Sequence, residues 1–255
     1  MLSISSKENK IFKKLKKLYE NRLFRKSERQ TILIGEHLID CCLNSNCKLR
    51  GVFIDSSIPL EKFQNLFVRL DDIPKYTLTN NLMREISLLK SCPGIIALAD
   101  IPSTSFTKPK DLNLFLDDIQ DPGNLGSIIR SAQAFNINAI FLSENCADVW
   151  SPKTLRGSQG AQFLINCHEK QSFENFLKDL SIPIFSLDLK GSSLSSTILK
   201  RDMVVIIGNE GNGVNKRYKK MVKASISIPM NNNVESLNVA SAASIMMYEY
   251  NRQFQ

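Results

Sequence analysis

The side chains best suited to polar chemistry begin in a loop that reads Asp121-Pro-Gly-Asn-Leu-Gly-Ser-Ile-Ile-Arg-Ser-Ala. Its Pro-Gly pair favours a turn, and Asn124 is well placed to cap a helix that starts just after it. Arg130 lies about 1.7 turns further along that helix, so the two side chains do not share a face. They converge on one ligand only if Arg130 reaches back along the helix. A capped helix with a surface arginine is the alternative.

Two later loops add further polar groups. The loop Gly208-Asn-Glu-Gly-Asn-Gly lets the backbone pass close to a ligand or adopt positive φ, but it lacks the Lys and Ser/Thr of a P-loop. Its Glu210 is either a site carboxylate or a helix-start carboxylate favoured by the helix dipole. The third loop contains Ser236 and Asn238 and leads into a helix rich in Ala and Ser. Those small side chains predict close helix packing, within the domain or across a dimer.

Apolar runs with the length of buried strands precede these loops. In the second half of the chain such runs alternate with segments able to form helices; the runs are Leu112–Ile119, Ala139–Leu142, Phe163–Cys167, Ile182–Leu187, Val204–Ile207 and Ser225–Met230. This alternation predicts an α/β fold with a mainly parallel sheet and helices on both faces. Ligands of such sheets bind at the carboxyl ends of the strands, so we expect the chemistry in the loops at that edge.

The first hundred residues predict a separate, small α/β domain. Residues 7–22 have apolar side chains at the spacing of one helical face, namely Ile11, Phe12, Leu15, Leu18 and Tyr19. The apolar runs that follow are Thr31–Ile34, Leu49–Ile54 and Phe67–Leu70, and the helical stretches between them are Glu36–Leu43, Leu60–Gln64 and Asn81–Leu89. Residues 101–110 are rich in turn and loop residues. We therefore predict domains at 1–100 and 111–255, joined by a linker at 101–110.

The charge of the chain favours a polyanionic partner. The net charge is +8, and residues 1–30 hold ten Lys or Arg against three Glu. A second basic cluster contains Lys216, Arg217, Lys219, Lys220 and Lys223. Clustered basic residues attract phosphates because each neutralised phosphate releases counterions. A solvated helix face is the alternative explanation of a charge run.

Composition argues against several other classes of protein. No run approaches the roughly 20 apolar residues of a membrane-spanning helix. The chain has two histidines, His37 and His168, and six cysteines without a CxxC pair, so we expect no metal; the cysteines are Cys41, Cys42, Cys47, Cys92, Cys146 and Cys167. We see no signal peptide and expect reduced thiols and a cytoplasmic location. The Lys-rich N-terminus could imitate an organellar presequence, but it contains Glu8 and runs straight into patterned sequence.

The ordered set of loop motifs resembles the SpoU/TrmH family of RNA methyltransferases. The matching segments are Asn124-Leu-Gly-Ser-Ile-Ile-Arg130, Ile207-Gly-Asn-Glu-Gly-Asn-Gly213, and Ile228-Pro-Met followed by Ser236-Leu-Asn238-Val-Ala240. The first hundred residues resemble the substrate-binding domain, related to a ribosomal protein fold, that precedes the catalytic domain in many members. There Leu33-Ile-Gly-Glu36 matches a pattern usually written with an acidic residue before the glycine, where this chain has Ile34.

The resemblance implies an RNA 2′-O-ribose methyltransferase that uses S-adenosylmethionine (SAM), carries a deep C-terminal trefoil knot and acts as a homodimer. Ribosomal RNA of the 23S type is the expected substrate, because members that act on transfer RNA commonly carry short flanking extensions where this chain has a full N-terminal domain. A transfer-RNA methyltransferase of the same family is one alternative. A non-catalytic RNA-binding or ribosome-assembly protein is another, and the joint presence of the site residues argues against it.

The resemblance also implies roles for individual residues. The expected catalytic residues are Asn124, Arg130, Glu210, Ser236 and Asn238, and the expected SAM-binding residues are Leu187, Gly208, Ile228 and Leu237. Arg130 would help deprotonate the ribose hydroxyl or, since a guanidinium stays protonated, hold a phosphate and orient that hydroxyl.

RNA contacts are expected in two places. Lys153 and Arg156 resemble a basic stretch that family members carry between the first two motifs, with ordinary surface charge as the alternative. The basic N-terminal segment adds Lys13, Lys14, Lys16 and Lys17. Trp150, the only tryptophan, is either a packing anchor or a platform for base stacking.

Overall fold

The structure is a computed structural model of the 255-residue chain. The residues that it describes are 1–45, 47–70, 72–87, 93–104, 108–178, 180–231 and 233–254. The chain forms two compact units. Unit 1 contains Met1–Ser103 and Trp150–Phe163, and unit 2 contains Thr104–Val149 and Leu164–Gln255. The domain limits expected from the sequence stay predictions, and residues 105–107 of the expected linker lie outside the described residues.

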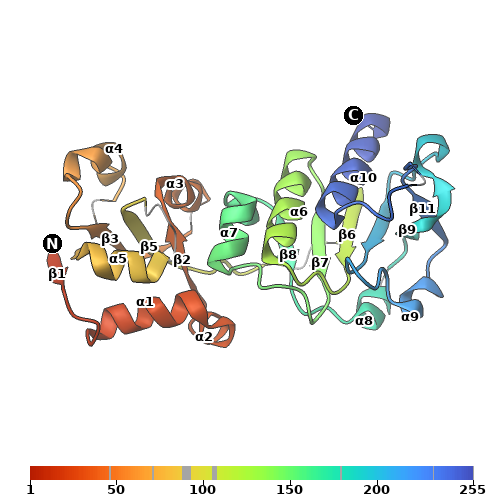
Figure 1. Cartoon of the computed structure of the whole chain (residues 1–255). Helices are drawn as coiled ribbons and strands as arrows, with labels where there is room; N and C mark the ends of the chain where they lie inside the picture. Colours follow the sequence, from red (N-terminus) through yellow and green to blue (C-terminus); the bar gives the residue numbers. More distant parts are fainter. Residues whose placement is uncertain are drawn as a thin grey trace. The chain divides into compact units, whose positions relative to one another are not determined.

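Unit 2 is built on a six-stranded sheet (Figure 1). In spatial order its strands are β11 (Ala224–Ser227), β9 (Ile184–Ser193), β10 (Met203–Ile207), β6 (Leu112–Leu116), β7 (Ala139–Leu142) and β8 (Asn166–His168). Each neighbouring pair of these strands is parallel. The predicted parallel sheet is therefore confirmed.

Helices cover both faces of this sheet. The helices of unit 2 are α6 (Pro122–Ala134), α8 (Phe173–Lys178), the 3₁₀ turn Leu194–Ser196, α9 (Lys216–Lys219) and α10 (Val239–Phe254). On one face α6 lies beside α10, with the Oγ atoms of Ser131 and Ser244 2.8 Å apart (Figure 1). On the other face the ring of Phe115 from β6 packs against Phe173 of α8 and Tyr218 of α9. The small side chains predicted on α10 thus allow close packing within this unit.

Unit 1 has its own five-stranded mixed sheet. In spatial order its strands are β1 (Leu2–Ile4), β4 (Lys75–Leu78), β3 (Leu49–Asp55), β5 (Ile95–Asp100) and β2 (Gln30–Ile34). Its helices are α1 (Lys10–Glu20), α2 (Arg22–Glu28), α3 (Glu36–Asn44), the 3₁₀ turn Leu60–Phe63, α4 (Gln64–Phe67), α5 (Asn80–Ser87), α7 (Pro152–Ser158) and the 3₁₀ turn Ala161–Phe163. The sheet is antiparallel around β5 and parallel around β4. Unit 1 is therefore an α/β unit, as predicted.

Helix α1 has the amphipathic character predicted for residues 7–22. The Asn9 side chain caps it by accepting hydrogen bonds from two backbone amides of its first turn. Phe12, Leu15 and Leu18 are fully buried in the core of unit 1, and most of the lysines occupy the remaining faces. Burial of this apolar stripe is what holds a lysine-rich helix on the sheet.

Residues 150–163 pack within unit 1 although they come late in the sequence. The Thr31 hydroxyl donates a 2.7 Å hydrogen bond to the Trp150 carbonyl, and the indole ring lies 5.3 Å from the ring of Phe163. Trp150 is 6% exposed, so its ring has no open face for a base. The packing-anchor interpretation of this tryptophan is correct.

Several expectations about the elements are wrong. The expected strand Ile182–Leu187 corresponds to β9, which starts at Ile184 and continues to Ser193, and the expected strand Ser225–Met230 ends at Ser227. The run Phe67–Leu70 is not a strand: α4 ends at Phe67, and Val68 is 75% exposed, so the run is not covered on both faces. The run Phe163–Cys167 begins as a 3₁₀ turn, and β8 starts only at Asn166. The expected strand Leu112–Ile119 ends at Leu116, because Asp118 has a positive φ of 62°. The last two residues of the expected helix Asn81–Leu89 and Cys92 lie outside the described residues.

Arg25 predicts a stability effect that its charge alone would not suggest. Its guanidinium is buried and donates hydrogen bonds to the carbonyls of Leu18 and Tyr19, at 2.6 and 2.9 Å, in the last turn of α1. We expect Arg25→Met to lower the free energy of unfolding of unit 1 by about 1–3 kcal/mol, because buried carbonyls lose their donor. Urea unfolding followed by Trp150 fluorescence measures this, since the only tryptophan lies in unit 1. The control Lys10→Met changes an exposed side chain of the same helix; an equal loss in both variants would contradict the assignment.

Across the described residues, no helix is long and apolar enough to cross a membrane. The same residues hold no group of three or more His, Cys, Asp or Glu that could bind a metal ion. Cys41, Cys42, Cys47, Cys146 and Cys167 are free thiols.

Candidate active site

The pairing of three strands of unit 2 stops at one level of the sheet. Leu187 of β9 pairs with Ile207 of β10, and Ile207 pairs with Leu116 of β6. The chain therefore leaves the sheet after Leu116 and Ile207 along one edge, while β9 continues past Leu187 to Ser193 beside β11. This is the carboxyl edge at which the sequence predicted the site, because parallel strands present the same ends on the same side.

The loop after β10 is held by a side chain that sequence reasoning overlooked. The side-chain Oδ1 of Asn209 accepts hydrogen bonds from the backbone amides of Gly211 and Asn212, at 2.9 and 3.1 Å. Its Nδ2 donates to the Asp118 carbonyl at 2.9 Å. The Gly213 amide closes the turn on the Asn209 backbone carbonyl at 2.8 Å. An Asn two residues before a Gly is a signal for such an Asx turn. The loop is thus fixed to the neighbouring strand end as well as to itself.

Asp117 is a second residue that supports these loops and that sequence reasoning overlooked. It directly follows β6, is 6% exposed, and accepts a 2.8 Å hydrogen bond from the Asn215 amide at the start of α9. Burial raises the pKa of this carboxyl above its usual value, the Asn215 hydrogen bond opposes that effect, and the neighbouring Asp118 adds to it. Asp117 therefore connects the end of β6 to the chain that leads into α9.

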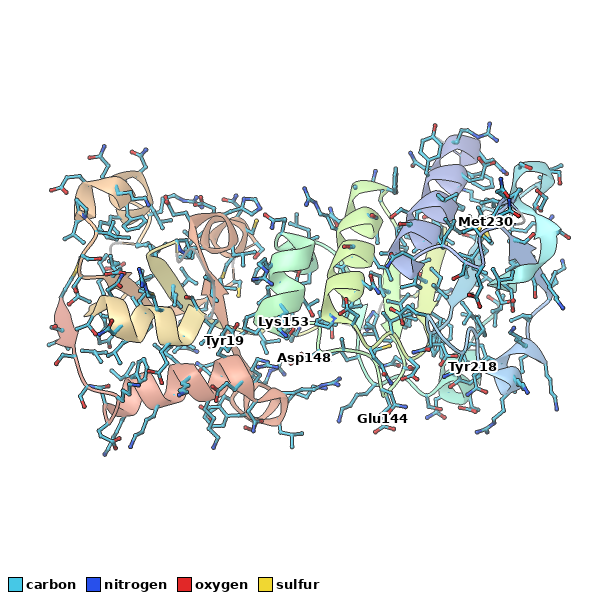
Figure 2. All side chains as sticks on the ribbon, viewed as in Figure 1. Tyr19, Glu144, Asp148, Lys153, Tyr218 and Met230 are labelled. Atoms are coloured by element: carbon cyan, nitrogen blue, oxygen red, sulfur yellow. The ribbon has the colours of Figure 1, made fainter. Side chains whose placement is uncertain are left out.

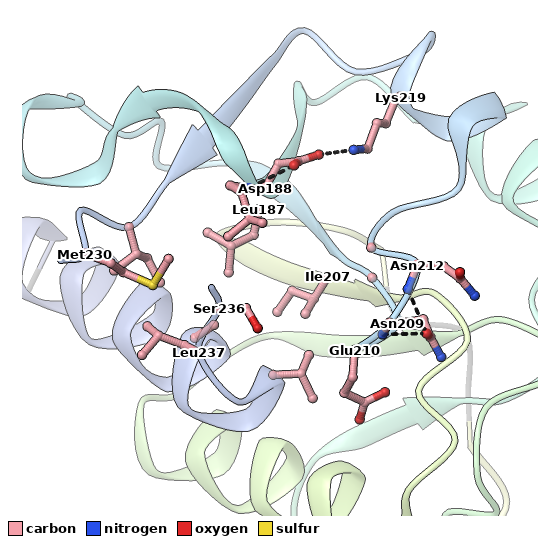
Figure 3. A pocket seen from close by; sticks show the side chains of 17 residues that line it. Leu187, Asp188, Ile207, Asn209, Glu210, Asn212, Lys219, Met230, Ser236 and Leu237 are labelled. Carbon is pink, nitrogen blue, oxygen red and sulfur yellow. Dashed lines mark hydrogen bonds and ion pairs between the residues drawn. The ribbon is translucent and has the colours of Figure 1, made fainter. Parts of the chain in front are cut away.

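A cavity of about 260 Å³ opens at this edge (Figure 3). The structure brings together all four residues expected to bind the cofactor, and they line this cavity: Leu187, Gly208, Ile228 and Leu237. Ser236 and Glu210, from the expected catalytic set, also line it. The other lining residues include apolar ones such as Ile207 and Val239, residues of the loop after β10, and the charged Asp188 and Lys219. A pocket of this kind suits a small ligand with both apolar and polar parts.

A chain of hydrogen bonds joins the three polar loops beside the cavity. The side-chain Nδ2 of Asn238 donates to the side-chain Oδ1 of Asn124 at 2.9 Å, and the side-chain Nδ2 of Asn124 donates to Glu210 Oε1 at 2.6 Å. The Asn238 oxygen also accepts from the Ala240 and Ser241 amides, so it caps α10. The expected helix cap at Asn124 is wrong. Asp121 caps α6 instead, because its Oδ1 accepts a hydrogen bond from the backbone N–H of Asn124 at 2.8 Å. Asn124 is thereby free to bridge the other two loops.

Arg130 is not drawn into this network. It lies on α6 as an exposed side chain and lines neither the cavity nor the shallow hollow beside Asn124. Its guanidinium makes no hydrogen bond or ion pair with the described residues. An exposed arginine without an internal partner is available to a ligand that comes from outside the protein.

The remaining expected RNA contacts lie in unit 1. Lys153 and Arg156 of α7 line a small hollow together with Tyr19 of α1. Figure 2 labels Lys153 and Tyr19 on these two helices. Burial raises the pKa of the Tyr19 hydroxyl, and the positive charge of Arg156 acts in the opposite direction. These side chains thus form a partly covered polar surface between α1 and α7.

The expected lysines of α1 already have partners inside unit 1. Lys13 pairs with Glu8, Lys14 with Glu28 at 2.7 Å, and Lys16 with Glu85 at 2.6 Å. The Lys17 ammonium lies 4.3 Å from the ring centroid of Phe24. Exposed ion pairs are worth at most about 1 kcal/mol, so a phosphate can compete for these cations.

Comparison with known proteins gives a family match over unit 2. Residues 111–248 match the family described as the SpoU rRNA methylase family. A Synechocystis protein described as an uncharacterised tRNA/rRNA methyltransferase is 30% identical, over 98% of this chain and 94% of its own. The Bacillus subtilis 23S rRNA guanosine 2′-O-methyltransferase RlmP is 29% identical, over 97% of this chain and 98% of its own.

A solved structure has the same fold over both units. It is the SpoU methyltransferase AviRb from Streptomyces viridochromogenes, determined in complex with the cofactor AdoMet. The TM-score is 0.88, the identity is 24%, and the match covers 96% of this chain and 98% of that one.

Proposed function

The chain belongs to the SpoU rRNA methylase family, and we propose that it transfers a methyl group from SAM to the 2′-hydroxyl of a ribose in ribosomal RNA, most specifically RNA of the 23S type. The observation that carries the proposal is that the expected cofactor residues and the polar network lie together at the carboxyl edge of the sheet. The four expected cofactor residues line a single cavity, and the Asn238–Asn124–Glu210 network stands beside it. The knot implied by the family resemblance is part of this proposal.

The cavity suits SAM chemically. It has apolar walls for the adenosine part, and a carboxylate, Glu210, for a positive group of the methionine part. Backbone groups at Leu187, Gly208, Ile228 and Leu237 would hold the cofactor, which supplies an activated methyl group when bound. The protein is then left with positioning and charge.

The side chains around the cavity have separate tasks in this proposal. Glu210 is held by Asn124 and places a negative charge at the rim of the cavity. Ser236 places a hydroxyl on the cavity wall. Asn238 binds Asn124 and fixes the orientation in which the side-chain amide of Asn124 donates to Glu210. Arg130 approaches the substrate from the open side, where its planar guanidinium holds a phosphate and orients the ribose hydroxyl.

RNA mapping tests the proposed function. Sites of 2′-O-methylation are compared in total RNA from cells with and without the gene, and one ribosomal RNA site is expected to disappear. Purified protein should then transfer labelled methyl groups from SAM to the same RNA. Loss of a transfer-RNA site would favour a transfer-RNA enzyme of the same family. An unchanged map, with no SAM binding at millimolar concentration, would favour the non-catalytic RNA-binding protein.

The proposal places RNA binding on unit 1. The surface formed by α1 and α7 carries Lys13, Lys14, Lys16 and Lys17 on the first helix and Lys153 and Arg156 on the second. Cations of this kind position an RNA backbone without reading its sequence. A cytoplasmic site of action belongs to the same proposal, because the described cysteines are free thiols and reduced thiols are typical of that compartment.

We also propose that the enzyme is a homodimer through the α6–α10 face. Ile245 and Tyr248 of α10 are 38% and 56% exposed there, next to a shallow hollow lined by Ser127 of α6 and Ser241 of α10. Light scattering is expected to give twice the 28.8 kDa mass of one chain. Ile245→Glu should shift the protein toward monomer, because a charge would be buried in an apolar contact, while Leu23→Glu on α2 should not. A wild-type monomer at working concentrations contradicts this arrangement.

A further inference from the structure

The cavity wall contains an ion pair that the proposed reaction leaves unused. Asp188 follows Leu187 on β9, and its Oδ2 pairs with the ammonium of Lys219, the last residue of α9 (Figure 3). Both side chains line the cavity, and they are 18% and 38% exposed. The Lys223 amide donates to the Ile184 carbonyl at 2.8 Å, which holds the chain after α9 against β9. The pair is therefore a built feature of the wall.

The hydrogen-bonding capacity of the two groups is used unequally. Asp188 Oδ1 accepts from the Leu189 amide at 2.8 Å and Oδ2 from Lys219, so each carboxylate oxygen has a partner. A lysine ammonium has three N–H donors, and among the described residues Asp188 is its only partner. Lys219 thus keeps spare donors at the cavity, whereas Asp188 is occupied.

The charges around the cavity indicate what those donors bind. Lys219 is the only cation among the described residues that line it, and the two lining carboxylates, Asp188 and Glu210, have partners in Lys219 and Asn124. SAM carries one anionic group, the carboxylate of its methionine part. The cavity therefore offers that carboxylate a single cationic partner. Figure 3 shows Lys219 and Glu210 on opposite sides of the cavity, so the cation lies away from the catalytic network.

We propose that Lys219 binds the carboxylate of SAM and that Asp188 is the positioning residue that holds Lys219 in place, an inference that rests on SAM as the cofactor. A lysine has a flexible stem and loses conformational freedom when it binds a ligand. Asp188 sits on a strand, so the pair orders the lysine before the ligand arrives and lowers the entropic cost of binding. One ammonium can serve both carboxylates, because its three donors point in different directions.

Isothermal titration calorimetry of the full chain with two ligands tests the inference. The ligands are SAM and decarboxylated SAM, which lacks only the carboxylate. Lys219→Met should raise the Kd for SAM about tenfold, the loss expected for a charge-assisted hydrogen bond, and leave the Kd for decarboxylated SAM within about twofold. The wild type should prefer SAM, and the variant should lose that preference.

Two further variants separate binding from structure. Arg217→Met removes a cation from the same helix, whose 3.1 Å partner is Glu174 and which does not line the cavity, so both Kd values should stay unchanged. Asp188→Asn keeps an oxygen for the Leu189 amide but frees Lys219, and it should reduce the preference for SAM in part. In the Lys219→Met background the same change should leave the ratio of the two Kd values unaltered, because Asp188 acts through Lys219.

Two results overturn the inference. A Lys219→Met variant that binds both ligands more weakly by the same factor means that Lys219 shapes the wall and does not contact the carboxylate. A variant that binds SAM as tightly as the wild type means that the ammonium has no role in binding. In both cases the wild type still binds SAM, so the proposed function survives. A wild type that binds neither ligand rejects the proposed cofactor itself.

Discussion

Arg130→Ala is expected to lower methyl transfer to RNA by about 10²–10⁴-fold while SAM affinity stays unchanged. The geometry dictates this split. Arg130 lines no part of the cavity, so its loss removes nothing that the cofactor contacts. It is also an exposed side chain without an internal partner among the described residues, so its loss leaves no buried group unsatisfied. Single-turnover transfer of labelled methyl groups measures the rate, and calorimetry measures SAM affinity.

The matched control for this variant is Arg201→Ala. Arg201 is also an exposed arginine of unit 2, but it precedes β10 and so lies toward the amino ends of the strands. Transfer should stay within about twofold of wild type, because a surface change away from the site has little effect. Normal transfer by Arg130→Ala would reject its assignment. Loss of SAM binding in that variant would show that Arg130 acts on the cofactor side.

Arg130→Lys distinguishes the two roles considered for this residue. A lysine keeps a positive charge for a phosphate but cannot form the bidentate contact of a guanidinium. If Arg130 holds a phosphate, the lysine variant should retain more activity than the alanine variant and keep the pH dependence of the wild-type rate. If Arg130 takes the proton, the pH dependence should move, because an ammonium has a lower ordinary pKa than a guanidinium.

The cofactor residues were predictable because their positions follow from periodic strands. Neighbouring parallel strands keep one register, and the pairing of Leu187 with Ile207 brings Leu187 and Gly208 to one level although β9 itself continues to Ser193. β10 is apolar and buried at all of its residues, as expected for a parallel strand covered on both faces, so the limits of its apolar run mark where the strand ends. The regular geometry of a parallel sheet is therefore what made the cofactor residues predictable from the sequence.

Local competition explains the incorrect cap at Asn124. Asp121 and Asn124 both accept amide hydrogen bonds well, but Pro122 fixes the first helical position and leaves Asp121 as the cap. The Asp-Pro pair was visible in the sequence and indicated this helix start. Its consequence is functional, because a capping Asn124 could not have reached Glu210 and Asn238.

Long-range packing explains what no local pattern could indicate. The pair of Asp188 with Lys219 depends on how the chain returns over β9 after the loop at Gly208. The membership of residues 150–163 in unit 1 depends on contacts such as Thr31 with Trp150. In unit 1, β1 and β4 are three and four residues long, too short for an alternating pattern to be recognised. Such features arise from tertiary contacts between segments that are individually unremarkable.

Gly208→Ala is expected to cost about 3 kcal/mol of stability, the upper part of the range for overpacked substitutions, and to abolish measurable SAM binding. A Cβ at this position would lie 2.2 Å from both the Gly213 carbonyl carbon and the Val214 amide nitrogen. Both contacts are backbone, so no side chain can rotate away. One of the two chain segments must move, and either movement changes the cavity, because Gly208 and Gly213 both line it.

Gly211→Ala in the same loop gives the matched comparison for stability. There a Cβ would meet only the Asn209 Oδ1 atom, at an ordinary 3.5 Å, so unfolding should change by no more than about 0.5 kcal/mol. Thermal unfolding of both variants, with and without SAM, measures the two effects together. Wild type should gain thermal stability from SAM by linkage, and Gly208→Ala should gain none. Two results would contradict this prediction: equal stability of the two variants, or a SAM-dependent gain in thermal stability of Gly208→Ala. Either result would show that the loop can move to accept a Cβ at Gly208, and that the close backbone approach there does not determine the shape of the cavity.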